Sequence, residues 1–151
     1  MDESLVAKME HEISRIDKSL SDVRPLLNLC TIKEKPDIVE ITAAAQVLHS
    51  FYNGVESIIV LIFKTIGERL PNDYKWHKTL FEMAFGENSR SIKLLDDSIK
   101  KKLGNYLSFR HFVRHSYSSE LDWKIMGPLI IEIEEIWKAI KINFNKFMEE
   151  N

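Results

Sequence analysis

The apolar residues of this chain recur at three- and four-residue steps along most of its length, which is the spacing of one face of an α-helix. The first such stripe comprises Leu5, Met9, Ile13, Ile16, Leu20, Val23 and Leu27. Hairpin patterns and internal repeats do not stand out, and five Gly and four Pro in 151 residues are too few for a loop-rich β protein. The pattern therefore predicts an all-α fold.

Breaks in the apolar pattern divide the chain into four to five predicted helices. They are a long first helix over residues 5–27, a second over 38–69, a short third that carries Trp76 to Phe85, a fourth over 91–115 and a last that carries Leu129 to Phe144. Short connections between long helices predict an up-down helical bundle, formed as one domain by residues 1–151.

Prolines and capping residues mark several of the predicted helix ends. Pro25 predicts a kink or an early end near Arg24, because proline removes a helical hydrogen bond. Asp37 is a predicted N-cap of the second helix, and Gly86 a predicted left-handed residue after the third. Pro128 is expected near the first turn of the last helix, or at a kink just inside it.

The composition of the chain indicates the cellular compartment in which it is expected. The longest uninterrupted apolar run, Ile58 to Phe63, is far shorter than the about 20 residues that span a bilayer, and it predicts burial on several sides or against a partner chain. The acidic N-terminus "MDESLVAKMEHE" lacks the apolar segment of a signal peptide. Cys30 is the lone cysteine and forms neither an internal disulfide nor a zinc site by itself. We therefore expect a cytoplasmic protein with no membrane partner.

Charge is distributed unevenly along the chain. The formal net charge of -2 excludes a protein that is basic along its whole length. Between residues 89 and 118, however, seven basic residues stand against two acidic ones: Arg90, Lys93, Lys100, Lys101, Lys102, Arg110 and Arg114 against Asp96 and Asp97. This segment is either a local site for a polyanion or an ordinary solvated helix face.

The stretch "SFRHFVRHSY", residues 108–117, crowds two arginines, two histidines and a tyrosine into a predicted helix end. At about 100° per residue, Arg110, Arg114 and Tyr117 share one stripe, and His111 and His115 share another. Arg110 and His115 are then about 140° apart, so one straight helix does not bring them together. The helix ends near His115, or long side chains converge on a ligand, or two copies of the helix build the site between them.

Three kinds of chemistry fit this cluster. A metal site has two histidines at i,i+4 spacing, but "HFVRH" lacks a third ligand and its arginine repels a cation, which argues against a metal. Cationic groups at a helix C-terminus also suit the helix dipole without any further role. Phosphodiester chemistry needs a forked, permanently charged phosphate ligand and a group that titrates near neutrality, which arginine and histidine supply.

The same residues resemble a known family. "RHFVRHSY" has the pattern Arg-x4-His-x-Tyr, with a polar His directly after the Arg, and resembles the motif of the HEPN superfamily, of its HepT-type toxins in particular. "LHSFYNGVESII" is similar to the second helix of those proteins, where a Tyr-Asn-Gly-x-Glu pattern recurs, and "SELDWKIMGPLI" also fits. The resemblance covers roughly residues 41–147.

The resemblance implies a HEPN-like homodimer whose two motifs face each other across a cleft. It implies a metal-independent, cofactor-free endoribonuclease, the toxin of a type VII-like pair, which cleaves tRNA or mRNA and leaves a 2′,3′-cyclic phosphate. The antitoxin is similar to a minimal nucleotidyltransferase (MNT) that transfers AMP to the motif tyrosine. By position, Arg110 and His115 become catalytic, His111 the polar motif residue and Tyr117 the AMPylation site. Arg114 lies within the x4 stretch, where the pattern does not fix the residue.

A polar stripe on the second predicted helix has two interpretations. Gln46, His49, Asn53 and Glu56 share a face because they are three or four residues apart. An exposed stripe is the simpler interpretation. The functional one places Asn53 and Glu56 beside the motif, with Glu56 pairing Arg110 or orienting a histidine.

Two other functions remain open beside the nuclease. One is a catalytically quiet HEPN binding module that partners a minimal nucleotidyltransferase. The other is a helical-bundle interaction protein in which the polar cluster is incidental. The simultaneous presence of Arg110, His115 and Tyr117 favours the nuclease, because a module without catalysis need not keep all three.

Overall fold

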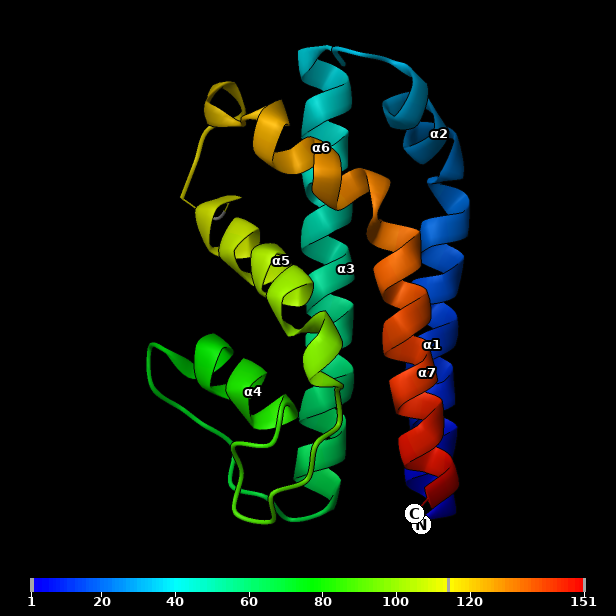
Figure 1. Cartoon of the computed structure of the whole chain (residues 1–151), viewed down its shortest axis with the longest axis vertical. Coiled ribbons are helices and arrows are strands. Elements are labelled where there is room, and N and C mark those ends of the chain that lie inside the picture. Colours follow the sequence, from blue (N-terminus) through cyan, green and yellow to red (C-terminus); the bar gives the residue numbers. More distant parts are fainter. Residues whose placement is uncertain (1, 114, 151) are drawn as a thin grey trace.

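The computed structural model describes residues 2–113 and 115–150, which fold into an antiparallel helical bundle (Figure 1). The α-helices in these residues are α1 (Glu3–Asp22), α2 (Arg24–Ile32), α3 (Ile38–Thr65), α4 (Trp76–Ala84), α5 (Lys100–Val113), α6 (Trp123–Ile131) and α7 (Ile133–Glu150). Short 3-10 turns, η1 (Asp97–Ile99) and η2 (Ser118–Glu120), precede α5 and α6. The all-α prediction is confirmed, since the described residues contain no strand.

Two of the five predicted helices are each divided in two, which gives seven α-helices in the part of the chain that the structure describes. The first divides at Val23, and Pro25 then lies in the first turn of α2, where its missing N–H costs no helical bond. The last divides at Glu132, four residues after Pro128, which lies inside α6. Asp37 caps α3 as predicted, in a reciprocal capping box with Glu40.

The predicted start of the fourth helix at Ser91 is wrong. The chain before α5 runs back along α4, and the backbone N–H groups of Leu94 and Leu95 both donate to the carbonyl of Ala84, at 2.9 and 3.0 Å. Both leucines are buried, so their apolar character reflects the core rather than a helical stripe. The helix also ends earlier than predicted, at Val113.

The second predicted helix ends at Thr65 rather than Arg69, because the chain turns there and the apolar spacing gives no sign of that turn. Gly67 adopts a φ of 83°, a left-handed conformation that glycine tolerates. The next residue, Glu68, is then directed at Ser89, whose backbone N–H and hydroxyl both donate to its carboxylate. This contact ties the end of α3 to the loop before α5.

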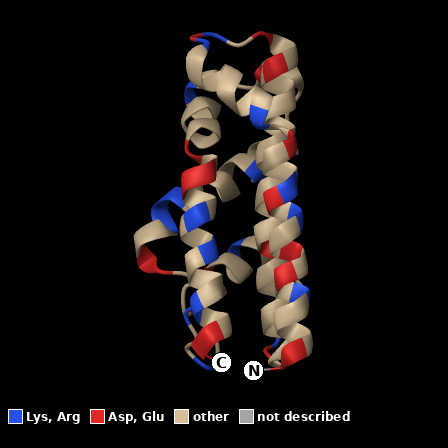
Figure 2. Ribbon diagram, turned by 90° about the vertical axis from the view of Figure 1, so that its right-hand side faces the viewer, with Lys and Arg blue, Asp and Glu red and all other residues tan. Residues whose placement is uncertain are grey.

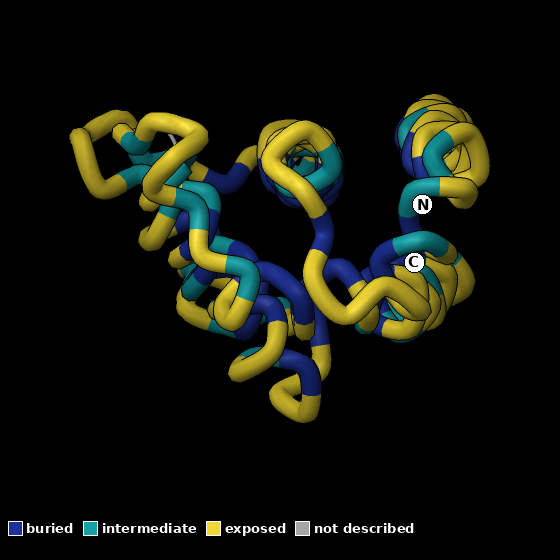
Figure 3. The backbone as a smooth tube through the Cα atoms, turned by 90° about the horizontal axis from the view of Figure 1, so that it is seen from above, coloured by how far each residue is buried: buried dark blue, intermediate teal, exposed yellow. Residues whose placement is uncertain are grey.

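Helix α3 is the centre of the bundle and contacts α1, α4, α5 and α6 (Figure 1). The apolar run from Ile58 to Phe63 lies mostly in the core, as predicted, and Figure 3 shows the buried segments facing inward. By length and composition alone α3 could cross a membrane. Its buried apolar side chains instead pack against the surrounding helices, as expected for the core helix of a folded domain.

Polar contacts and close packing fix the helices around α3. The buried hydroxyl of Tyr106 donates to the carbonyl of Leu129 at 2.7 Å and joins α5 to α6. The indole N–H of Trp137 donates to the carboxylate of Asp17 at 2.7 Å and joins α7 to α1. At Gly54, a Cβ atom would lie 2.8 Å from Cγ1 of Ile16, so the absence of a side chain lets α1 approach α3 closely.

Part of the basic segment is neutralised by acids that lie nearby in the fold. Lys93 pairs with Asp97 at 2.7 Å, and Lys100 pairs with Glu82 at 2.8 Å. Figure 2 shows basic and acidic residues interleaved along the helices. Glu82 lies outside the basic segment, so the excess of positive charge around α5 is smaller than the sequence count indicates, although Lys101 and Lys102 remain exposed.

Candidate active site at the end of helix α5

Arg110 lies in the last turn of α5 and is turned toward α3. Its Nε donates to Oδ1 of Asn53 across 2.8 Å, between residues 57 positions apart in the chain. Arg110 is half-buried at this contact. On a helical wheel Arg110 lies beside the core face of α5, and this position lets its guanidinium reach α3.

Asn53 continues this contact along α3. Its Nδ2 lies 3.0 Å from Nε2 of His49, one helical turn toward the N-terminus. A chain of hydrogen bonds therefore runs from Arg110 through the amide of Asn53 to the imidazole of His49. All three side chains are half-buried, in the part of the bundle where the middle of α3 meets α5.

Glu56 forms the second polar contact of α3. Its carboxylate is buried, and Oε2 lies 2.8 Å from Nδ1 of His77, which projects from α4. The charges of Glu56 and Arg110, one from each polar contact, both act on the buried phenol of Tyr52. Its pKa is raised, chiefly by burial and further by the negative charge of Glu56, while the positive charge of Arg110 opposes this shift. Tyr52 therefore stays a neutral phenol.

The two motif histidines lie on the solvent side of the helix end. Because α5 ends at Val113, His115 falls in a turn, with its N–H donating to the carbonyl of Phe112 at 3.2 Å. The rings of His111 and His115 meet edge to face, with centroids 5.4 Å apart. Both histidines are exposed.

Tyr117 is 80% exposed and follows the turn, and its backbone N–H donates to Glu120 at 3.2 Å. Arg114, the remaining residue of the motif, lies outside the described residues. Within one chain the motif therefore presents two faces. Arg110 is bound to α3, whereas the histidine pair and Tyr117 are presented to solvent.

The interpretation of the α3 polar residues as an exposed stripe is wrong. Only Gln46 is exposed, whereas His49 and Asn53 are half-buried and Glu56 is 6% exposed. Asn53 contacts Arg110, and the histidine that Glu56 contacts is His77 rather than a motif residue. Sequence reasoning missed His77, and its lone position in "YKWHKTLF" gives no signal of a partner 21 residues earlier.

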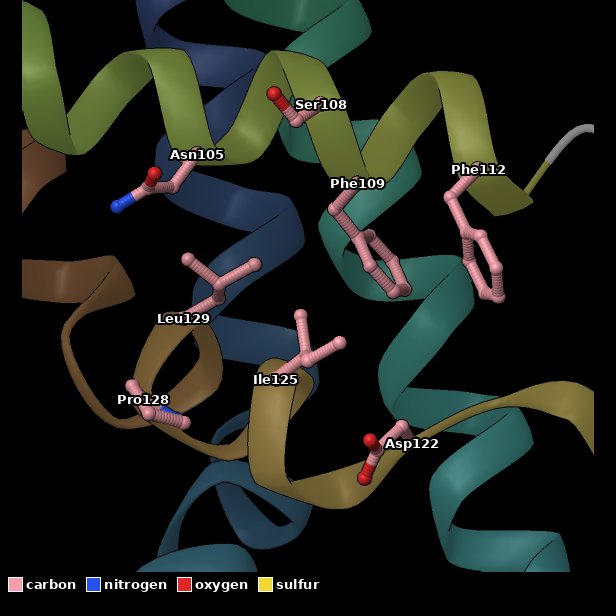
Figure 4. A pocket seen from close by; sticks show the side chains of 8 residues that line it. All are labelled: Asn105, Ser108, Phe109, Phe112, Asp122, Ile125, Pro128 and Leu129. Carbon is pink, nitrogen blue, oxygen red and sulfur yellow. The ribbon is translucent and has the colours of Figure 1, made fainter.

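Two hollows flank the end of α5. Figure 4 shows an apolar groove of about 460 Å³ between α5 and α6, into which Phe109 and Phe112 project toward Ile125 and Leu129. A more polar cavity of about 310 Å³ lies between α3 and the segment after α5, and it is lined by Thr42, Ala45, Gln46, His49, Val113, Ser116, Ser118 and Leu121. Of these two hollows, the polar cavity is the one that shares a residue, His49, with the contacts of Arg110.

The protein groups that the site offers for binding are cationic side chains and an amide. Within residues 2–113 and 115–150, no group of three or more His, Cys, Asp or Glu side chains is placed to hold a metal ion. The arrangement offers a guanidinium held in place by an amide on one face of the helix end and two exposed imidazoles on the other. These groups suit the binding of a phosphate and the transfer of a proton.

Comparison with known proteins agrees with the residue pattern. A model of HepT-like proteins matches residues 43–151, which include α4 to α7, most of α3 and every motif residue. No curated protein and no solved structure matches the chain. The family match covers more than two thirds of the chain, and HepT-like proteins are a HEPN-type toxin module. This chain therefore belongs to the HepT-like family of the HEPN superfamily.

Proposed function

We propose that this protein is an endoribonuclease toxin that cleaves RNA without a metal ion. The observation that carries the proposal is the fixed guanidinium of Arg110, held by Asn53 at a helix end that also carries a pair of exposed histidines. A guanidinium binds a phosphate oxygen through parallel hydrogen bonds, and a histidine exchanges protons near neutrality. The family to which the chain belongs supports a toxin of this kind.

In the proposed reaction His115 is the general base. It accepts the proton of a ribose 2′-hydroxyl, and the oxygen attacks the adjacent phosphorus as the bond to the 5′ oxygen breaks. One product ends in a 2′,3′-cyclic phosphate, and the other gains a proton and ends in a 5′-hydroxyl. Arg110 stabilises the negative charge that develops on the phosphoryl oxygens. His111 and Arg114 position the RNA strand.

We propose that a second copy of the chain completes the site. Arg110 is turned toward α3 while His115 packs against His111, so one chain presents them on different faces. Two helix ends that face each other would bring the arginine of one copy to the histidine of the other. Mixing an Arg110→Ala protein with a His115→Ala protein tests this arrangement. Restored cleavage in mixed dimers supports the shared site, and an inactive mixture contradicts it.

The exposed hydroxyl of Tyr117 is the proposed site of silencing. At 80% exposure the residue is open to a second enzyme, and it lies two residues from His115. A minimal nucleotidyltransferase antitoxin would attach AMP by attack of the phenol oxygen on the α-phosphate of ATP, with release of pyrophosphate. The bulky nucleotide would then block the helix end. In this proposal the pair acts in the cytoplasm on tRNA or mRNA.

Expression in cells tests the function directly. Induction of the wild-type chain should stop growth and degrade RNA, and Arg110→Ala or His115→Ala should abolish both effects. Intact mass after co-expression with the neighbouring nucleotidyltransferase should increase by one or more AMP groups, and Tyr117→Phe should remove that increase. Intact RNA with preserved nucleotidyltransferase binding would instead identify a catalytically quiet binding module.

A further inference from the structure

The hydrogen bonds between Arg110, Asn53 and His49 can be satisfied in one way. Arg110 has donors only, so the atom of Asn53 that faces it is the amide oxygen. The amide nitrogen of Asn53 therefore faces His49, and it too can only donate. Nε2 of His49 must accept this bond, which requires a neutral imidazole with its proton on Nδ1.

We propose that neutral His49 is a positioning residue for Arg110. Protonation of His49 places an N–H on Nε2, opposite the N–H of Asn53, and removes the acceptor from this contact. If the Asn53 amide rotates to relieve that repulsion, its nitrogen faces Arg110 and the contact that holds the guanidinium is lost. The imidazole of His49 therefore holds Arg110 in its phosphate-binding position only while it is neutral.

His49 adjoins a polar cavity at the end of α5. The imidazole lines the polar cavity of about 310 Å³, where Thr42 and Gln46 of α3 face Ser116 and Ser118. These neighbours carry hydroxyl and amide groups, and the other lining residues are apolar. Arg110, one amide away, contributes a positive charge that disfavours a second one on His49.

This role rests on the proposed ribonuclease function only for its consequence in catalysis. The prediction about the tautomer concerns the folded protein and holds whether or not the chain cleaves RNA. The two claims are therefore tested separately, one by spectroscopy and one by kinetics.

The tautomer is tested by NMR of the full-length protein labelled with ¹⁵N. A two-bond ¹H–¹⁵N spectrum at neutral pH should show His49 protonated on Nδ1 and bare on Nε2. Asn53→Asp should raise the pKa of His49, because a carboxylate at this position accepts from Arg110 and also favours a protonated imidazole. A proton on Nε2 of His49 in the wild type, or an unchanged pKa in Asn53→Asp, overturns the proposal.

The effect on catalysis is tested with two matched substitutions. In His49→Gln the side-chain oxygen takes the place of Nε2, whereas the shorter His49→Asn cannot reach Asn53. We expect His49→Gln to keep kcat within about threefold of wild type and His49→Asn to lose about tenfold or more, since misplaced catalytic groups cost up to about 10²-fold. His11→Gln, on the exposed face of α1, is the control. Equal losses in the Gln and Asn variants contradict the positioning role.

The pH profile separates positioning from packing. Protonation of His49 should release Arg110, so it should contribute to the loss of wild-type cleavage at acid pH. His49→Gln removes this one protonation, so the acid limb of its pH profile should be less steep than that of wild type. Identical acid limbs overturn the proposal while leaving the ribonuclease function intact, and loss of activity in Arg110→Ala reports on the ribonuclease function alone.

Discussion

Arg110 and Asn53 join two helices through one hydrogen bond of 2.8 Å, from Nε of the arginine to Oδ1 of the amide. This contact uses one donor of the guanidinium and leaves its two terminal nitrogens to bind a ligand. A charged side chain at a helix end is otherwise mobile, and the bond to α3 restricts where the guanidinium lies. The proposed phosphate site is therefore built by α3 as much as by the helix that carries the motif.

Replacement of Asn53 by alanine should weaken both catalysis and stability. Arg110 keeps access to solvent and loses its fixed position, so we expect kcat to fall by about 10- to 100-fold. The free energy of unfolding should fall by about 1–3 kcal/mol, the usual effect of removing a hydrogen bond to a charged group. Single-turnover cleavage and urea unfolding of the same preparations measure the two effects. A purely structural role of Asn53 would show as a loss of stability with unchanged kcat.

Loss of the contact between Glu56 and His77 should lower the stability of the fold. His77→Ala leaves the buried carboxylate of Glu56 without its partner at Nδ1, and we expect destabilisation on the order of 3 kcal/mol. Glu56→Gln keeps an acceptor for His77 and should cost less than about 1 kcal/mol. Urea unfolding distinguishes the pair. Equal effects of the two substitutions would show that the lost bond is not the cause.

Replacement of two helical glycines by alanine should change the stability of the fold in opposite directions. In Gly54→Ala the new methyl group would lie 2.8 Å from Ile16, and crowding of about 1–3 kcal/mol outweighs a helix-propensity gain of about 1 kcal/mol. In Gly104→Ala the new group meets Phe81 at 3.7 Å, an ordinary contact, so the propensity gain should stabilise the fold. Thermal unfolding of both variants checks the contrast. Stabilisation by Gly54→Ala would contradict the close approach of α1 to α3.

Acid should weaken the contact between Glu68 and Ser89. The hydrogen bond from the Ser89 hydroxyl lowers the pKa of Glu68 below its ordinary value of 4.5, with the backbone N–H of Ser89 and the charge of Arg90 acting in the same direction. A lowered pKa stabilises the fold above pH 4.5, and this contribution disappears as the pH falls through the folded-state pKa. Glu68→Gln should therefore be less stable than wild type at neutral pH, and the difference should shrink in acid. A difference that is constant with pH would exclude the ionised contact.

Much of the fold follows from apolar spacing and prolines. The stripe from Leu5 to Leu27 predicts α1 and α2 with their division near Pro25, and the capping box at Asp37 fixes the start of α3. Apolar residues alone misplace the start of α5. Leu94 and Leu95 are buried in an extended segment whose backbone bonds to Ala84, and helical spacing cannot distinguish such a segment from a helix.

The candidate site, too, can be predicted from the sequence only in part. The motif residues are visible in the sequence because their types and spacing are unusual, and the α3 pattern draws attention to Asn53 and Glu56. Which atom meets which partner depends on how the helices cross. The partner of Glu56 is His77, 21 residues away on α4, and the role of His49 follows only from the donors and acceptors of its neighbours.

The central claim is that Arg110 and His115 cleave RNA without a metal ion. Protein expressed and purified alone is incubated with end-labelled single-stranded RNA in excess EDTA, and the termini of the products are identified. We predict cleavage that leaves 2′,3′-cyclic phosphates, a loss of about 10²-fold or more in Arg110→Ala and in His115→Ala, and full activity in His11→Ala. Intact RNA with the unmodified wild-type protein, or cleavage by His115→Ala at the wild-type rate, would contradict the account.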